Sequence, residues 1–122
     1  MTSPGKVFII AADDAIRDSL SVLLEHSGFS VTALASCHTF PGMLESSGRS
    51  CLLIDIHGED DTPFELLDRL RLEQPHLPAI ALVSAPGDRR VLRRPHLAAI
   101  EKPMLGGAIV EAVRTAMARF GH

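Results

Sequence analysis

Tryptophan and tyrosine are absent from this sequence of 122 residues, and aromatic residues make up only 4% of it. A core built from this chain must therefore rely on aliphatic side chains. These are abundant, because hydrophobic residues reach 46% of the composition, which excludes a disordered tail. The length suits one domain over residues 1–122 and is too short for two hydrophobic cores.

Cysteine and long apolar runs are also scarce. The two thiols, Cys37 and Cys51, are too few for a disulfide framework, so we expect two buried free thiols in a reducing cytoplasm. No stretch approaches the roughly 18 consecutive apolar residues of a membrane span. The first ten residues lack the hydrophobic segment and cleavage site of a secretion signal. We therefore expect a cytoplasmic protein without a membrane segment.

Charge is modest, with a formal net charge of −3 that gives no general reason to expect nucleic acid binding. Lysine is rare, because Lys6 and Lys102 stand against ten arginines. Four of these arginines form a cluster: Arg89, Arg90, Arg93 and Arg94. The cluster is either a solvated helix face or a basic surface for a partner protein. Without interleaved aromatic residues or a recognition helix, nucleic acid is the weaker interpretation.

Five short apolar runs of strand length alternate with segments of helical spacing. The runs cover residues 6–11, 29–35, 51–56, 79–83 and 97–101. This alternation predicts βαβ units, and hence one five-stranded parallel sheet with helices on both faces. The third run is apolar on both sides, which predicts a strand buried on both faces. Sheets of this kind bind ligands beyond the carboxyl ends of their strands.

The helical segments between these runs differ in strength. The first carries apolar residues on one face from Ile16 to Leu24. The motif TPFE at residues 62–65 is the clearest helix start, with Thr62 as the cap and proline at the first helical position. Pro95 limits the helix after residue 88 to a turn or two. A last amphipathic helix follows residue 105.

Polar side chains follow the expected strands at their carboxyl ends. They are Asp13 and Asp14 after the first strand, Asp55 at the end of the third, Ser84 after the fourth, and Lys102 after the fifth. Asp55 is flanked by apolar residues, so its burial requires a cation or hydrogen bonds. Lys102 can supply that cation as a point charge across the edge of the sheet. We therefore expect Asp55 and Lys102 to lie in direct contact or to be bridged by one ion.

The sequence resembles a response regulator receiver domain in the order of its motifs. These are FII followed by DD and R, then LLID, then LPAIAL with a following S, and finally IEKP. The sequence is most similar to receivers that carry a LuxR-type helix-turn-helix output. The resemblance implies a flavodoxin-like (βα)5 sandwich whose Asp55 accepts a phosphoryl group from a histidine kinase. It also implies that Lys102 stabilises the phosphoryl oxygens, that Ser84 turns toward the phosphoryl group, and that the Lys102–Pro103 bond is cis.

The sequence departs from the family at the end of the first strand. The two acids that the family places there fall on Ala11 and Ala12, and Asp13 and Asp14 come one to two residues late. We favour these aspartates as caps of the first helix, because aspartate is a strong N-cap and suits the helix dipole. A bulge that draws Asp13 back into the pocket is the alternative.

The ligands that the resemblance implies for Mg²⁺ are correspondingly few. They are Asp55, the backbone carbonyl at His57, and Asp13 if such a bulge exists; the His57 side chain itself is expected to lie exposed in a loop. Mg²⁺ is typically held by one or two protein carboxylates together with substrate oxygens. We therefore expect Mg²⁺ binding to be weak or absent.

Three further departures concern the output side of the domain. The segment between Asp88 and Lys102 is shorter than in the family, which predicts a shortened fourth helix. The aromatic residue that usually precedes the lysine is Ala99. The family's hydroxyl position falls on Val83, and Ser84 occupies it only if one residue is inserted.

These features together predict an atypical receiver domain that is not an enzyme, with impaired Mg²⁺-dependent phosphorylation. Its expected partners are a histidine kinase, another signalling protein, or a second copy bound through the output face, without direct nucleic acid binding. One alternative is a working receiver that uses Asp13 or Asp14 for Mg²⁺. Another is a haloacid-dehalogenase-like phosphotransferase, which is weakened because His57 stands where that class has a second aspartate.

Overall fold

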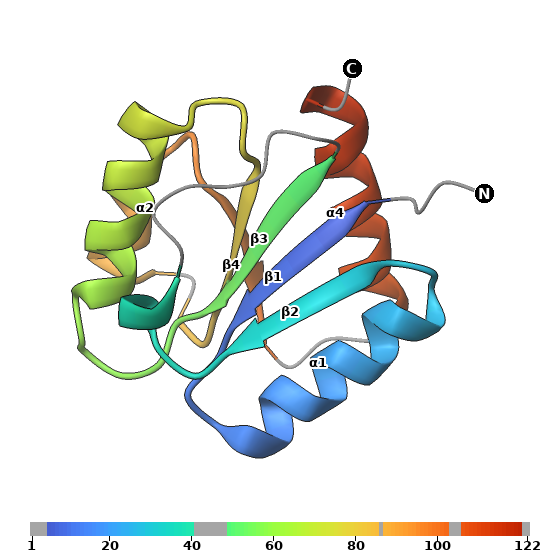
Figure 1. The fold of residues 1–122 in the computed structure, drawn as a ribbon. Coiled ribbons are helices and arrows are strands. Elements are labelled where there is room, and N and C mark those ends of the chain that lie inside the picture. The colour runs from blue at the N-terminus through green and yellow to red at the C-terminus, as the bar shows by residue number, and fades with distance from the viewer. Residues whose placement is uncertain (1–4, 41–48, 86, 103–105, 121–122) are drawn as a thin grey trace.

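A computed structural model of the chain describes residues 5–40, 49–85, 87–102 and 106–120. It contains a five-stranded parallel sheet in the order β2-β1-β3-β4-β5 (Figure 1). The strands are β1 (Lys6–Ile10), β2 (Ser30–Leu34), β3 (Ser50–Asp55), β4 (Ala79–Val83) and β5 (Ala98–Glu101). Each of the five apolar runs thus forms a strand, and the predicted parallel sheet is confirmed.

The helices between the strands follow the predicted pattern. They are α1 (Asp14–His26), the 3₁₀ turn η1 (Cys37–Thr39), α2 (Thr62–Glu73), α3 (Arg89–Leu92) and α4 (Gly106–Phe120). The fourth helical segment, α3, is a single turn, so the predicted shortening is confirmed. Within the described residues, no helix combines the length and apolar character needed to cross a membrane. The predicted cis bond before Pro103 lies outside the described residues.

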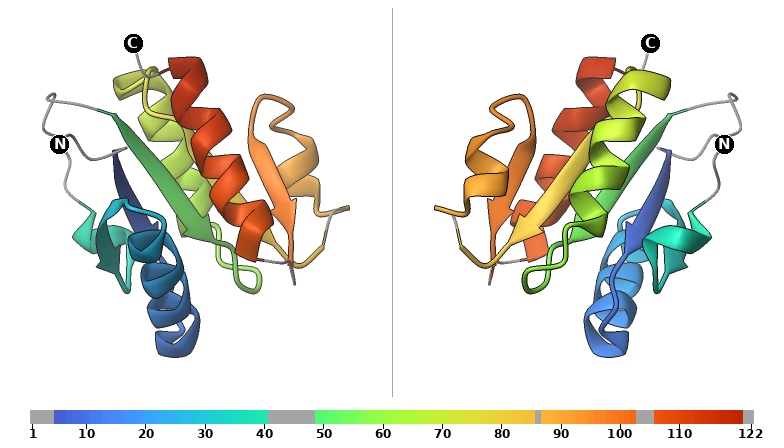
Figure 2. Two further views of the ribbon diagram at one scale, coloured as in Figure 1. Left: turned by 90° about the vertical axis from the view of Figure 1, so that its right-hand side faces the viewer. Right: turned by 90° about the vertical axis from the view of Figure 1, so that its left-hand side faces the viewer.

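Two hydrophobic layers hold the helices against opposite faces of the sheet (Figures 1 and 2). Helices α1 and α4 cover one face, and α2 with η1 covers the other. Strand β3 contributes to both layers, because successive side chains of a strand point to opposite faces. Cys51 and Leu53 pack on the α1 side, while Leu52 and Ile54 pack on the α2 side. The predicted burial of this strand on both faces is confirmed.

The start of α2 differs in detail from the prediction. Thr62 is already the first helical residue, and Asp61 precedes it without a side-chain capping bond. The carboxylate of Asp60 instead accepts hydrogen bonds from the backbone N–H of Thr62 at 3.0 Å and from its hydroxyl at 2.7 Å. The cap therefore lies at Asp61 rather than at Thr62 as predicted, and the charged carboxylate of Asp60 satisfies the N–H of the first helical residue.

The two cysteines are free thiols, as predicted, but only one of them is buried. Cys51 lies fully inside the sheet, and burial raises the pKa of its thiol to about 12. This thiol therefore stays protonated and unreactive at neutral pH. Cys37 is half-buried, so the prediction of burial was wrong for this residue, which begins the short turn η1 rather than a strand.

Two helical leucines with opposite exposure test this layered core. Leu24 in α1 is fully buried, whereas Leu72 in α2 is 84% exposed. Leu24→Ala should lower the free energy of unfolding by ~2–5 kcal/mol, because it removes apolar contacts and leaves a cavity. Leu72→Ala should change it by less than about 0.5 kcal/mol. Urea denaturation followed by far-ultraviolet circular dichroism measures both; equal losses would contradict the assignment of faces.

Candidate functional site

The buried carboxylate of Asp55 lies at the carboxyl end of the central strand β3. Its side chain is only 2% exposed, and the ammonium of Lys102 donates a hydrogen bond to its Oδ1 at 2.7 Å. The same ammonium donates to the carbonyl of Ile56 at 3.1 Å. The ion pair supplies the compensating charge that a buried carboxylate requires. The predicted contact between Asp55 and Lys102 is therefore confirmed, and it is direct.

Strand pairing places Lys102 at this position. Val83 is paired with Glu101 across β4 and β5, and the next N–H, that of Lys102, donates to the carbonyl of Val83 at 2.7 Å. Lys102 thus continues the ladder one residue beyond β5. On the other side of β4, the N–H of Ile56 donates to Leu82 at 2.9 Å and extends β3 in the same way. The acid and the lysine meet because parallel strands end at the same edge.

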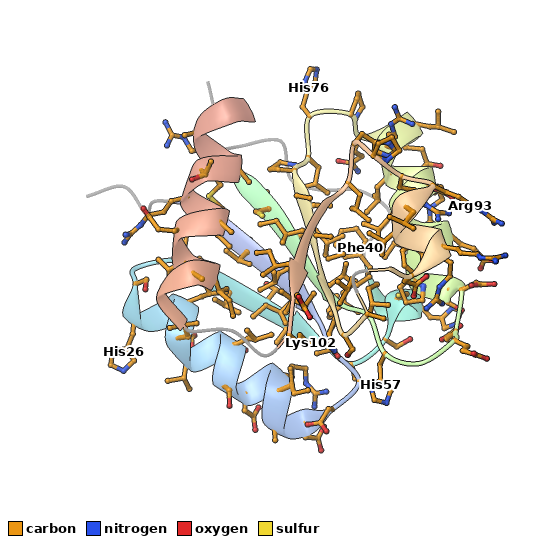
Figure 3. All side chains as sticks on the ribbon, turned by 180° about the vertical axis from the view of Figure 1, so that it is seen from behind. His26, Phe40, His57, His76, Arg93 and Lys102 are labelled. Carbon is orange, nitrogen blue, oxygen red and sulfur yellow. The ribbon has the colours of Figure 1, made fainter. Side chains whose placement is uncertain are left out.

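Ser84 and His57 also follow strands at this edge, and both are exposed. Ser84 comes directly after β4. His57 points outward from the domain in Figure 3. The histidine side chain thus lies in an exposed loop, as predicted. The roles of Ser84 toward a phosphoryl group and of the His57 carbonyl toward a metal stay predictions.

The aspartates after β1 belong to the first turn of α1. Asp13 is the N-cap of this helix, and its Oδ1 accepts the N–H of Ile16 at 3.0 Å. Asp14 is the first helical residue and forms an ion pair with Arg17. Arg17 also donates to the carbonyl of Ala11 at 2.9 Å, which draws the helix start toward the strand end. The capping interpretation of Asp13 is confirmed.

The residues at the end of β1 do not fit the Mg²⁺ site that the resemblance implies. Ala11 is buried and Ala12 is exposed, and neither side chain has an oxygen that could bind a hard cation. The carboxylate of Asp13 is turned toward the helix instead. Within the described part of the chain, no three His, Cys, Asp or Glu side chains gather closely enough to hold a metal ion. Asp13 as a metal ligand stays a prediction.

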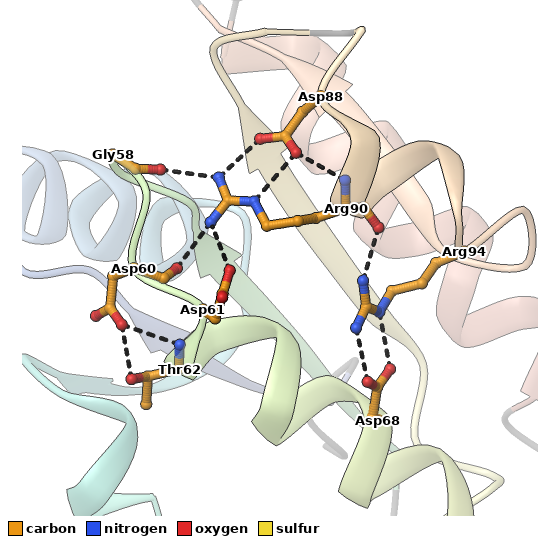
Figure 4. A network of polar contacts seen from close by, with 8 residues as sticks. All are labelled: Gly58, Asp60, Asp61, Thr62, Asp68, Asp88, Arg90 and Arg94. Atoms are coloured by element: carbon orange, nitrogen blue, oxygen red, sulfur yellow. Dashed lines mark hydrogen bonds and ion pairs between the residues drawn. The ribbon is translucent and has the colours of Figure 1, made fainter.

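A second polar network lies beside this edge and is centred on Arg90 (Figure 4). Its guanidinium donates to the carbonyls of Gly58 at 2.8 Å and Asp60 at 2.9 Å. It also bonds both carboxylate oxygens of Asp88, at 3.1 and 2.7 Å, and contacts Asp61 at 3.3 Å. Arg90 therefore joins the loop after β3 to the beginning of α3.

Arg94, two residues after the end of α3, fastens this helix to α2. Its guanidinium forms two parallel hydrogen bonds to the carboxylate of Asp68, at 2.8 and 2.7 Å, and donates to the carbonyl of Arg90 at 2.7 Å. Both guanidinium groups lie over the ring of Phe64, at 4.7 and 4.8 Å from its centroid. The two arginines thus hold α3 on α2 through ion pairs and cation–π contacts.

The network corrects the interpretation of the arginine cluster. The side chains of Arg90 and Arg94 are only 19% exposed and are bound inside the molecule, so neither a solvated face nor a partner surface describes them. Arg89 and Arg93 are exposed, and Arg93 points away from the domain in Figure 3. The spacing i and i+4 correctly placed each pair on one face. Two acidic partners of these arginines, Asp61 before α2 and Asp68 within it, lie far away in the sequence. The local sequence therefore did not indicate these contacts.

The same contacts shift the acid–base equilibria of the network. Hydrogen bonds from the side chain and the backbone N–H of Arg90 lower the pKa of Asp88 to about 2. The bidentate bond from Arg94 lowers the pKa of Asp68. The carboxylate of Asp88 in turn raises the pKa of Arg90. All of these groups therefore stay charged at neutral pH, and the network is intact there.

Charge reversal tests whether these arginines serve the fold. Arg90→Glu combined with Arg94→Glu should lower the free energy of unfolding by more than ~2 kcal/mol, because it removes charge-assisted hydrogen bonds and places like charges together. Arg89→Glu combined with Arg93→Glu is the matched control on the exposed face and should change it by about 0.5 kcal/mol or less. Urea denaturation of both variants decides; equal stabilities would refute the assignment.

Acid titration tests the Arg90–Asp88 pair. The pKa of Asp88 is lowered in the folded state, so the stabilisation it provides is present above its ordinary value of 3.8 and is lost as the pH falls toward about 2. In Arg90→Gln the carboxyl pKa should rise, and stability should depend less on pH in this range. Urea denaturation at several pH values, with carbon NMR of the Asp88 carboxyl, measures the difference. An unchanged Asp88 titration would count against the pair.

Comparison with known proteins identifies relatives of this chain. No family model matches the chain. It is 32% identical over 116 residues to the transcriptional regulatory protein FixJ of Azorhizobium caulinodans, and the match covers 93% of this chain and 55% of that protein. The chain spans about half the length of the curated relatives it matches.

Solved structures agree with this relationship. Full-length FixJ from B. japonicum superposes with a TM-score of 0.79 at 25% identity, covering 97% of this chain and 60% of that one. A response regulator receiver domain protein from Clostridium thermocellum superposes with a TM-score of 0.79 at 20% identity, covering 94% and 95% of the two chains, and shares the fold. The predicted flavodoxin-like fold is confirmed. The chain is homologous to FixJ and belongs to the response regulator receiver domains of two-component signalling.

Proposed function

We propose that this chain is an atypical receiver domain that acts mainly through protein contacts, with Asp55 as a candidate phospho-acceptor whose Mg²⁺-dependent phosphorylation is impaired. One observation carries the proposal. The acids that follow β1 belong to the first turn of α1, and alanines precede them at the strand end. Asp55 therefore faces this edge with Lys102 as its cation and without carboxylates from β1 that could hold a divalent one.

The chemistry explains why this arrangement impairs transfer. Phosphoryl transfer depends mainly on positioning and on neutralising charge around the phosphoryl oxygens. An oxygen of Asp55 would bond to phosphorus as the bond from phosphorus to the donor breaks, which releases the kinase histidine or, with acetyl phosphate, acetate. Lys102 would neutralise one phosphoryl oxygen. A single ammonium leaves the remaining negative charge uncompensated. A missing counter-charge near a protein surface is worth about 4 kcal/mol for unit charges ~4 Å apart at intermediate dielectric.

A working Mg²⁺-dependent receiver is the second candidate. It would cost the free energy of releasing Asp13 from the cap of α1. Asp13 would have to release the N–H of Ile16 and turn toward Asp55. Loss of an N-cap costs about 1 kcal/mol, which binding of a divalent cation can offset. Homology to receiver domains favours both candidates over a haloacid-dehalogenase-like phosphotransferase. We accordingly propose a signalling module rather than an enzyme.

The partners are proposals of the same kind. A histidine kinase or another signalling protein is the expected partner, in the cytoplasm, and a second copy is expected to bind through the output face. The exposed residues of α3 and its C-cap are Arg89, Leu92 and Arg93, and Leu92 is 64% exposed. These three, rather than the bound Arg90 and Arg94, are the residues in and directly after α3 that a partner can contact. We expect no direct nucleic acid binding by this domain.

Restoring the acids at the end of β1 tests the proposal. Wild type should bind Mg²⁺ weakly and react poorly with acetyl phosphate. Ala11→Asp combined with Ala12→Asp should raise Mg²⁺ affinity roughly tenfold to a hundredfold and increase phosphorylation, because carboxylates then lie where the strand ends. The variant should be less stable without metal, because Ala11 is buried. Isothermal titration calorimetry measures Mg²⁺ affinity. Mass spectrometry of the protein after incubation with acetyl phosphate measures phosphorylation.

Two controls sharpen this experiment. Asp55→Asn in the double variant should abolish the gain in phosphorylation. Asp13→Asn in the wild-type chain should leave Mg²⁺ binding unchanged, since an asparagine still caps a helix. Tight Mg²⁺ binding by the wild type that is lost on Asp13→Asn would overturn the proposal in favour of the working receiver.

A further inference from the structure

Arg90 connects two segments that both leave the carboxyl edge of the sheet. The first is the acceptor loop, residues 57–61, which follows Asp55 and Ile56. The second runs from the end of β4 through Ser84 to Asp88 and α3. The guanidinium binds two carbonyls of the acceptor loop and both carboxylate oxygens of Asp88. One side chain thus spans the two loops that flank the candidate acceptor.

The acceptor loop is also connected to the Asp55–Lys102 pair. The carbonyl of Ile56, directly before the loop, is the second acceptor of the Lys102 ammonium. Two residues later, the carbonyl of Gly58 accepts from Arg90. Gly58 has a φ of +67°, in the left-handed region that favours glycine. The chain therefore turns sharply between the contact with Lys102 and the contact with Arg90.

We propose that Arg90 is a positioning residue for the acceptor site, which couples the acceptor loop to α3. By holding the loop, it keeps the carbonyl of Ile56 in reach of Lys102, and a displacement of either segment is transmitted to the other. The role requires arginine, because a guanidinium carries five donors in a rigid fork and a lysine ammonium cannot reach both loops at once. The inference concerns the same site as the proposed function, but it does not depend on phosphorylation.

Arg94 provides a matched control for this role. Arg90 and Arg94 both have 19% side-chain exposure, and both lie over the ring of Phe64. Arg94 binds α2 through Asp68, while Arg90 binds the acceptor loop. A purely structural role for the pair predicts the same consequences for both substitutions. Positioning of the acceptor site predicts that only Arg90 affects Lys102.

The scarcity of lysine makes this difference measurable. The chain has two lysines, so protein labelled with ¹³C at the lysine ε-carbon gives two side-chain signals. The substitution Lys6→Arg removes one of these signals and so assigns it to Lys6. In the other proteins the Lys6 signal then serves as an internal reference. Arg90→Gln should shift the Lys102 signal and leave that of Lys6 in place, whereas Arg94→Gln should leave both unchanged. The backbone amide of Thr62, which is bonded to Asp60, should exchange with solvent roughly tenfold faster in Arg90→Gln.

Arg90→Lys separates geometry from charge. Arg90→Lys keeps the positive charge but loses the forked set of donors, so it should shift the Lys102 signal as Arg90→Gln does. If Arg90→Gln does not fold, Arg90→Lys serves as the test in its place. An unmoved Lys102 signal in Arg90→Lys, or an equal shift in Arg94→Gln, would overturn the coupling. Strong Mg²⁺-dependent phosphorylation of the wild type would refute the proposed function and leave this result unaffected, so the two can fail separately.

Discussion

A buried carboxylate at the end of the central strand governs the carboxyl edge of this domain. Asp55 ends a strand whose residues 51–55 are buried, so its charge requires a partner from the protein. The ammonium of Lys102 lies 2.7 Å from the carboxylate of Asp55 because β5 ends at the same edge of the sheet. The backbone N–H of Lys102 is held by a hydrogen bond to Val83 of β4. The ammonium also bonds the carbonyl of Ile56, which orders the beginning of the acceptor loop. The pair therefore links three neighbouring strands at their ends.

The short helix α3 shows how the chain compensates for a missing element. A single turn of helix without a buried residue has little intrinsic stability. Val91 packs only partly buried against the hydrophobic layer, and Arg90 and Arg94 add ion pairs and contacts over the ring of Phe64. These interactions connect α3 to α2 and to the acceptor loop. The edge strand β5 stays partly exposed, because so short a helix covers little of the sheet.

The end of β1 decides where the aspartates that follow it act. Two alanines follow this strand, so the first acids of the segment lie at the start of α1. Asp13 caps α1 and Asp14 lies in its first turn, where negative charge suits the helix dipole. Their position along the chain therefore gives them a role in starting the helix. Ala11, which precedes them, packs in the hydrophobic layer.

The sequence by itself determined the five strands, their alternation with helices in a parallel sheet, and the contact between Asp55 and Lys102. These features follow from local periodicity and from the rule that parallel strands end at one edge. It also indicated that Asp13 caps α1, since capping involves neighbours three residues apart. Only the tertiary structure revealed the role of Arg90 and Arg94. Their partners on α2 and the acceptor loop lie 26 to 32 residues away, and no local pattern encodes which side chains meet across that separation.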